Sequence, residues 1–152
     1  MSEGSLKTFD EAVRLVESVI TALGLSAADA ALSAEEPTKT RAFALKRGSA
    51  RVVVAVHAND AGGTIRVLAP CVKLGATPSA EFFKHLLELN ARELVGAAFG
   101  VFGEDVVVVA ERSVEDLDTS EVDAMIRTVG RIADRHDDVL AQRFGVRRAS
   151  DA

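Results

Sequence analysis

The chain has 152 residues, of which 48% are hydrophobic and 27% are charged, and its formal net charge is −5. This length and composition are typical of one globular domain that buries a core of its own. The acidic balance argues against a nucleic-acid-binding protein, which needs a basic surface. The chain has no Trp and no Tyr, and this argues against a surface for stacking bases.

The N-terminal stretch MSEGSLKTFDE lacks the apolar run of a secretory signal. No segment approaches the length of apolar chain that a membrane span requires. A single cysteine, Cys71, cannot form an internal disulfide. We therefore expect a cytoplasmic protein that does not enter a membrane.

The first predicted helix begins at Thr8, because Thr8 and Glu11 have the spacing of a capping box. It ends before Gly24, a residue suited to a helix C-terminus. Residues 25–39 form a connecting arm for which no structure is predicted. The helix carries an apolar stripe at steps of three and four residues, formed by Phe9, Val13, Val16, Ile20 and Leu23.

Three strands are predicted next, over residues 41–47, 50–58 and 64–74. Their β-branched residues and their period of two favour strands over helices. Short turn-like links join them, and short links require neighbouring strands to run antiparallel.

A second helix opens with Thr77 as its cap and Pro78 at its first position, and two further strands cover residues 97–103 and 105–111. A long third helix follows over residues 119–144, opened by a capping box of Asp118 and Glu121. Its predicted apolar stripe comprises Val122, Met125, Ile126, Val129, Ile132, Ala133, His136, Val139, Leu140 and Phe144.

The predicted element order is α-β-β-β-α-β-β-α, an α+β fold with an antiparallel five-stranded sheet and three helices. We expect one domain over residues 1–152, with frayed tails at residues 1–7 and 146–152.

The strands carry apolar residues on both faces. Val52, Val54 and Val56 lie on one side of their strand, whereas Val53 and Ala55 lie on the other. An antiparallel sheet covered on one face should instead alternate apolar and polar residues. Either the long third helix covers the second face, or another polypeptide does. We favour the second explanation, with a homodimer or larger assembly.

No residues with the spacing of a catalytic or metal site appear. The histidines His57, His85 and His136 lie on three separate elements, and His136 belongs to an apolar stripe. Asp134 and Asp138 flank His136, but carboxylates one turn apart on a polar helix face are most simply solvated. Cys71 alternates with strand residues and is expected to be a small core residue. We therefore expect no metal, no cofactor and no enzymatic activity.

Asn90 follows Leu86, Leu87 and Leu89 at the expected end of the second helix. Together with the stretches FALKRGSARVVVAV (43–56) and FGVFGEDVVVVAE (99–111), this order of motifs resembles the YbjN-like family. That family is similar in fold to the type III secretion (CesT-like) chaperones. The resemblance covers roughly residues 8–145.

The resemblance implies a small, dimeric, bacterial protein that binds an extended segment of a partner protein over an apolar surface of sheet and helix. It supplies no catalytic residue, and it makes Asn90 a structural marker that ties the second helix to the strands after it.

We therefore expect a non-enzymatic, chaperone-like protein whose partner-facing patch comprises Val53, Ala55, Arg66 and Leu68. The alternative is a regulatory or sensory module that binds a small ligand or a signalling protein.

Overall fold

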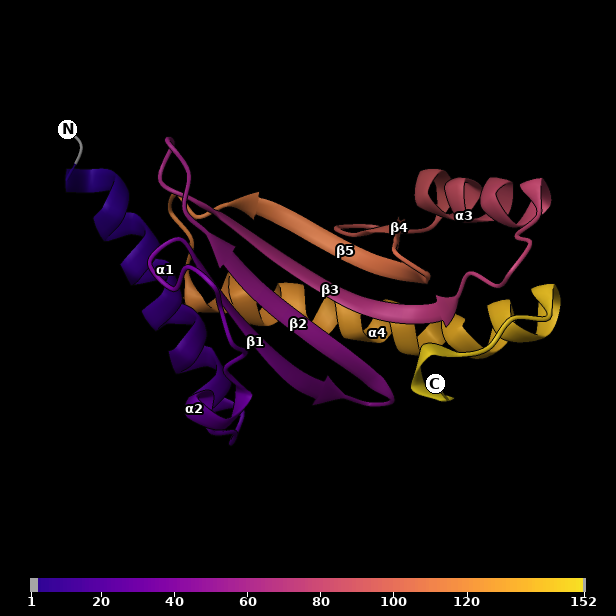
Figure 1. Cartoon of the computed structure of the whole chain (residues 1–152), viewed down its shortest axis with the longest axis horizontal. Helices are drawn as coiled ribbons and strands as arrows, with labels where there is room; N and C mark the ends of the chain where they lie inside the picture. Colours follow the sequence, from indigo (N-terminus) through magenta and orange to yellow (C-terminus); the bar gives the residue numbers. More distant parts are fainter. Residues whose placement is uncertain (1–2, 152) are drawn as a thin grey trace. The chain divides into compact units, whose positions relative to one another are not determined.

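The computed structural model describes residues 3–151, with side chains from Phe9 onward. It confirms the predicted α+β fold and the predicted order of three long helices and five strands, and it adds a four-residue helix within the connecting arm (Figure 1). The helices are α1 (Glu3–Ala22), α2 (Ala27–Ala30), α3 (Ala80–Arg92) and α4 (Thr119–Phe144), and a 3-10 turn, η1, covers Ala149–Asp151. The strands are β1 (Thr40–Arg47), β2 (Ala50–His57), β3 (Thr64–Lys73), β4 (Ala98–Phe102) and β5 (Asp105–Ser113).

The five strands form one antiparallel sheet with the order β1-β2-β3-β5-β4 (Figure 1). The chain forms two compact units, and β1, β2, β3, β5 and α4 contribute residues to both of them. The single domain over residues 1–152 stays a prediction. The first unit comprises Met1–Leu45, Val53–Val67 and Glu111–Ile126, and the second comprises Lys46–Val52, Leu68–Ala110 and Arg127–Ala152.

The core of the first unit confirms the predicted periodicities. Helix α1 buries one face at helical spacing, and β2 and β3 bury alternate residues there, as their patterns predict. These buried side chains are Phe9, Val13, Val16, Ile20, Val54, Val56, Ile65 and Val67.

In the second unit, α4 packs on the strands through its smallest residues. A Cβ at Gly130 would lie 3.1 Å from Arg47 Cβ and 3.5 Å from Val52 Cγ2. The Cys71 thiol on β3 lies 3.4 Å from the Ala133 carbonyl oxygen. Helix α3 completes this core, because the ring of Phe82 stacks on that of Phe144 at a centroid distance of 4.7 Å.

The inner face of α4 differs from the predicted stripe at Gly130, Asp137 and Val139. Val139 was expected to be buried but is 57% exposed, whereas Asp137, which is not part of the predicted stripe, is 5% exposed. The periodicity is correct, but the buried face also includes Gly130 and Asp137. A buried carboxylate needs partners, and Asp137 has them in Ser49 and in the backbone N–H of Asp138.

Two predicted helix starts are wrong, and one is confirmed. Helix α1 begins at Glu3 rather than Thr8, and the cap of α3 is Ser79 rather than Thr77, since the Ser79 hydroxyl accepts from the Phe82 N–H at 3.1 Å. Ahead of α4 the predicted capping box is present. Asp118 Oδ1 accepts from the Glu121 N–H at 2.8 Å, and Glu121 Oε2 accepts from the Asp118 N–H at 2.9 Å.

The C-terminal segment contacts β3, and the frayed tail over residues 146–152 stays a prediction. Arg148 forms a bridge with Val72 on β3, and the Lys73 N–H donates to the Arg147 carbonyl at 2.8 Å. The segment therefore pairs with β3 through its backbone. At the other end of the chain, residues 3–7 lie in α1, and residues 1–2 lie outside the described residues.

Candidate functional site

The strands of the first unit present half-buried apolar residues opposite their buried ones. Val53 and Ala55 alternate with Val52, Val54 and Val56, which are fully buried. We call these alternate, half-buried residues the outward positions. Arg66 occupies an outward position of β3, and its guanidinium binds Glu111 of β5 at 2.6 Å. This part of the sheet therefore presents small apolar side chains beside one exposed ion pair.

The second unit repeats the arrangement. Leu68 and Pro70 are half-buried outward positions of β3. On β5, Val107 pairs with Gly100 of β4, and a Cβ at Gly100 would lie 4.0 Å from methyl groups of both Val107 and Val109. Val107 is nevertheless buried, at 4% exposed, whereas Val109 is half-buried.

The four residues predicted as the partner-facing patch all occupy outward positions. Val53, Ala55 and Arg66 lie in the first unit, and Leu68 lies in the second. None of them belongs to the buried core. Whether they contact a partner stays a prediction.

Sequence reasoning missed a second group of apolar residues, all of them in the second unit. Five large apolar side chains in the described part of this unit are exposed to solvent, and they lie on α3, β4, α4 and the loop after α3. The sequence signal for the exposed residues of β4 was the short apolar strand AFGVF beside two glycine-containing turns. The alternation of that strand alone does not reveal that it lies at an edge of the sheet. The five exposed residues are Leu87, Val95, Val101, Phe102 and Val139.

Strand β4 lies at an edge of the sheet, next to β5. The backbone N–H and C=O of Phe99 point away from β5 and bind Asn90. Because backbone groups alternate in direction along an antiparallel strand, the N–H and C=O of Val101 also point away from β5. Within the described residues, no hydrogen bond outside the sheet reaches the backbone of Val101. At the other edge, β1 is partly covered, because the Leu32 N–H donates to the Ala42 carbonyl at 2.8 Å.

Asn90 links α3 to β4. Its amide donates to the Phe99 carbonyl at 3.2 Å, and its Oδ1 accepts from the Phe99 N–H at 2.7 Å. Both polar atoms of the side chain are therefore occupied by one backbone residue, as if Asn90 were a neighbouring strand. It lies inside α3, two residues before the end of that helix rather than at the end.

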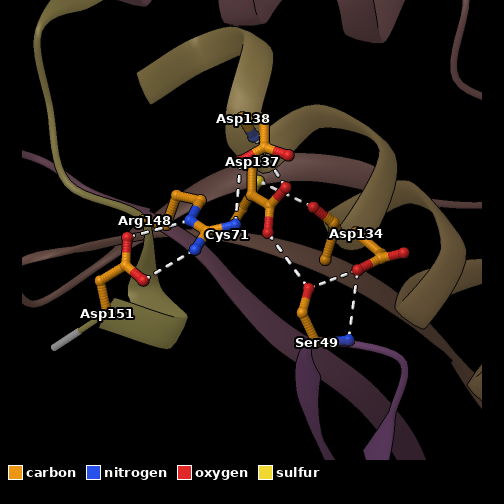
Figure 2. Close-up of polar contacts among 8 residues, drawn as sticks. Ser49, Cys71, Asp134, Asp137, Asp138, Arg148 and Asp151 are labelled. Atoms are coloured by element: carbon orange, nitrogen blue, oxygen red, sulfur yellow. Dashed lines mark hydrogen bonds and ion pairs between the residues drawn. The ribbon is translucent and has the colours of Figure 1, made fainter. Parts of the chain in front are cut away.

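A polar cluster joins the turn between β1 and β2 to α4 and the C-terminal segment (Figure 2). The Ser49 hydroxyl and N–H bind Asp134, and the hydroxyl also lies 3.2 Å from Asp137. Arg148 binds Asp138 at 2.9 Å and Asp151 at 2.8 Å. The carboxylates are thus held by internal partners, and Asp134 and Asp138 are not merely solvated as we expected.

The cluster does not have the composition of a metal or catalytic centre. In the described part of the chain, no group of three or more His, Cys, Asp and Glu could hold a metal ion. Burial, reinforced by the charge of Asp137, raises the pKa of the Cys71 thiol to about 12. Such a thiol stays protonated and is not a nucleophile near neutral pH.

The histidines have separate structural partners. His57 Nδ1 lies 3.2 Å from Thr40 Oγ1, and His136 Nδ1 lies 3.0 Å from the Ile132 carbonyl. The His136 ring also meets the Phe99 ring edge-on at 5.5 Å. These contacts are those of packed histidines rather than of ligands that converge on one point.

Residues 10–152 match the family described as "T3SS (YopN, CesT) and YbjN peptide-binding chaperone 1". No protein of curated function matches the chain in sequence. Among the described residues, no helix has both the length and the hydropathy to cross a membrane.

Three solved structures share the fold at low sequence identity. A chain of the ExsC–ExsE complex has 18% identity and a TM-score of 0.62, with 86% of this chain and 94% of that chain covered. A chain of the ExoU–SpcU heterodimer from the type III secretion system of Pseudomonas aeruginosa has 12% identity and a TM-score of 0.57, covering 84% and 98%. A chain of the HopA1–SchA chaperone–effector complex has 8% identity and a TM-score of 0.55, covering 86% and 94%.

Replacement of Asn90 by alanine should lower the free energy of unfolding by about 2 kcal/mol, since two partly buried hydrogen bonds to Phe99 are lost. Urea denaturation measures the change. Lys84→Ala on the exposed side of the same helix is the control, with an expected change within about 0.5 kcal/mol. Equal losses in the two variants would contradict the structural role of Asn90.

Replacement of Ser49 by alanine should raise the pKa of Asp134 toward its ordinary value, because the Ser49 hydroxyl is the main cause of its lowered pKa. A carboxyl whose pKa is lowered by folding stabilises the protein above its unfolded pKa, and this stabilisation is lost as the pH falls through the folded pKa. Urea midpoints should therefore separate wild type from Ser49→Ala at about pH 7, and the separation should shrink as the pH falls through the folded pKa of Asp134. A separation as large in acid as at neutral pH would contradict this explanation.

Proposed function

Because the chain belongs to the family of T3SS (YopN, CesT) and YbjN peptide-binding chaperones, we propose that it binds an extended segment of a partner protein at the outward positions of its strands. The residues proposed to contact the segment are Val53, Ala55, Arg66 and Leu68. The role is that of a binding protein and not of an enzyme. We further propose that it acts in the cytoplasm, which agrees with the protonated, unpaired Cys71.

The observation that carries this proposal is that both the inward-facing and the outward-facing side chains of the strands are apolar. Val54 and Val56 are needed for the core and are fully buried, but Val53 and Ala55 are not needed there. Their partly exposed methyl groups are stabilised only if another surface removes them from water. Such burial lowers the free energy by about 25 cal/mol per Å² of apolar area. An extended segment presents side chains at the same two-residue spacing and can supply that surface.

The polar groups at the outward positions suit a peptide as well. Arg66 and Glu111 form an ion pair in which each side chain is 43% exposed. An exposed pair of this kind contributes little to stability, so that either partner can bind a charged or polar side chain of the client at little cost.

The alternative, a module for a small ligand, is less well supported. A small-ligand site is a concave, mostly apolar pocket with a few convergent polar groups. A cavity of about 340 Å³ beside the loop after α3 is instead lined by Glu93, Arg131, Arg135 and His136 together with Leu94, Val95 and Ile132. Such a rim of charged side chains favours a protein surface over a small apolar ligand.

We also propose a homodimer that uses the β4 edge. Val101 is 52% exposed and Phe102 is 67% exposed, and the outer backbone groups of Val101 have no partner strand among the described residues. An edge strand with exposed apolar side chains pairs readily with a second chain. Leu87 on α3 and Val95 on the following loop supply further apolar area in the same unit.

Replacement of Val53 by aspartate should weaken capture of the client at least tenfold, because a charge would be desolvated against an apolar segment. The measurement is quantitative affinity capture from the native cell, with circular dichroism to verify folding and Leu68→Ser as a milder second variant. Leu25→Asp, at an exposed apolar residue after α1, is the matched control and should bind as wild type does. Unchanged capture by folded Val53→Asp and Leu68→Ser would remove these positions from the binding surface.

Light scattering should give wild type a mass of about twice 16.1 kDa. Phe102→Asp should reduce the mass to that of one chain, because the charge would be buried in the paired edge. Leu25→Asp again serves as the control and should leave the mass unchanged. A wild-type protein with the mass of a single chain would contradict the dimer.

A further inference from the structure

A cavity of about 310 Å³ lies in the second unit, beside the turn between β1 and β2. It is lined by side chains from the four strands β1, β2, β3 and β5, the β1–β2 turn and the C-terminal segment. Those that matter for recognition are Lys46, Arg51, Lys73, Asp105, Pro70 and Ser150.

The charge of this cavity is opposite to that of the chain. Lys73 Nζ is paired with Asp105 Oδ1 at 2.7 Å. Lys46 and Arg51 have no hydrogen-bond or ion-pair partner within the described region. Two unbalanced positive charges therefore face one cavity in a protein whose net charge is −5.

Anion binding here would depend on these cations rather than on the hydroxyl of Ser49, which also lines the cavity. That hydroxyl is engaged with Asp134 and Asp137 on α4. A guanidinium such as that of Arg51 can bind both oxygens of a carboxylate, and the ammonium of Lys46 can add a third contact.

The cavity continues the outward positions of β3. Pro70 lines it, and Pro70 is the next outward position after Leu68. Two residues of a strand advance about 6.6 Å, so a segment lying on Leu68 brings its own next side chain on that side to the cavity.

We propose that this cavity binds the carboxylate of an aspartate or glutamate in the client segment, between Lys46 and Arg51. The site thereby selects acidic residues at one position of a mainly apolar, extended peptide. This inference rests on the proposed function, since the client must lie along β3 to reach the cavity.

Selection from a random library of twelve-residue peptides displayed on phage tests the inference without a known client. Peptides selected by wild type should be enriched in Asp or Glu at one position beside alternating apolar residues. Peptides selected by the double variant Lys46→Gln with Arg51→Gln should keep the apolar alternation and lose the acidic enrichment. The matched control, Lys84→Gln with Arg92→Gln, removes the same two charge types from exposed positions of α3 and should select as wild type does.

The affinities of a selected peptide and of its isostere, with Gln in place of Glu, then measure how strongly the cavity prefers the carboxylate. The acidic peptide should bind wild type about fivefold more tightly at low salt, the expected size for a partly exposed charge pair. The preference should vanish at high salt and in the double variant, because screening weakens such pairs.

Each outcome decides between the two proposals. Apolar peptides without acidic enrichment would overturn this inference and leave the proposed function standing. No selected peptide at all would overturn the proposed function, and the inference with it. Inorganic phosphate that competes with no selected peptide but shifts the NMR signals of residues around Lys46 and Arg51 would assign the cavity to a free anion and overturn the inference.

Discussion

A β-strand turns alternate side chains to opposite faces, and in this chain both sets of side chains are apolar. Burial of Val54, Val56, Ile65 and Val67 builds the core, and no further apolar residue is required on the other side of those strands. The outward residues nevertheless include Val53 and Ala55. A surface of this kind is tolerated in water while its side chains are small and flanked by neighbours. The free energy falls when a partner covers it. The family assignment, the proposed client site and the acidic specificity are consistent with this one constraint.

The element order was predictable because each element carries a periodicity that its neighbours support. Apolar residues recur every two residues in the strands and every three or four residues in α1 and α4. The local sequence pattern and the tertiary packing therefore favour the same elements. The capping box of Asp118 and Glu121 is local and was predictable for the same reason. The outward location of Val53, Ala55, Arg66 and Leu68 also follows from alternation once the buried phase is known.

What the sequence could not supply depends on contacts between distant residues. The burial of Asp137 in place of Val139 depends on the packing of α4 against the β1–β2 turn, where the Ser49 hydroxyl lies 3.2 Å from Asp137 Oδ2. The placement of the C-terminal segment depends on the bridge from Arg148 to Val72 and the ion pair to Asp138. The exposure of Phe102 requires the strand order, which places β4 at an edge. Neither periodicity nor propensity encodes such pairings, and the basic cavity was missed for the same reason.

The central claim is that a client covers the outward positions of the strands, and site-specific photo-crosslinking in the native cell tests it most directly. A photoreactive amino acid would replace Val53, Ala55 or Leu68, with Val139, an exposed apolar residue of α4, as the reference position. The account predicts that the three strand positions crosslink to one client protein and that position 139 does not. Crosslinks to the client from position 139 alone, with none from the strand positions, would contradict it.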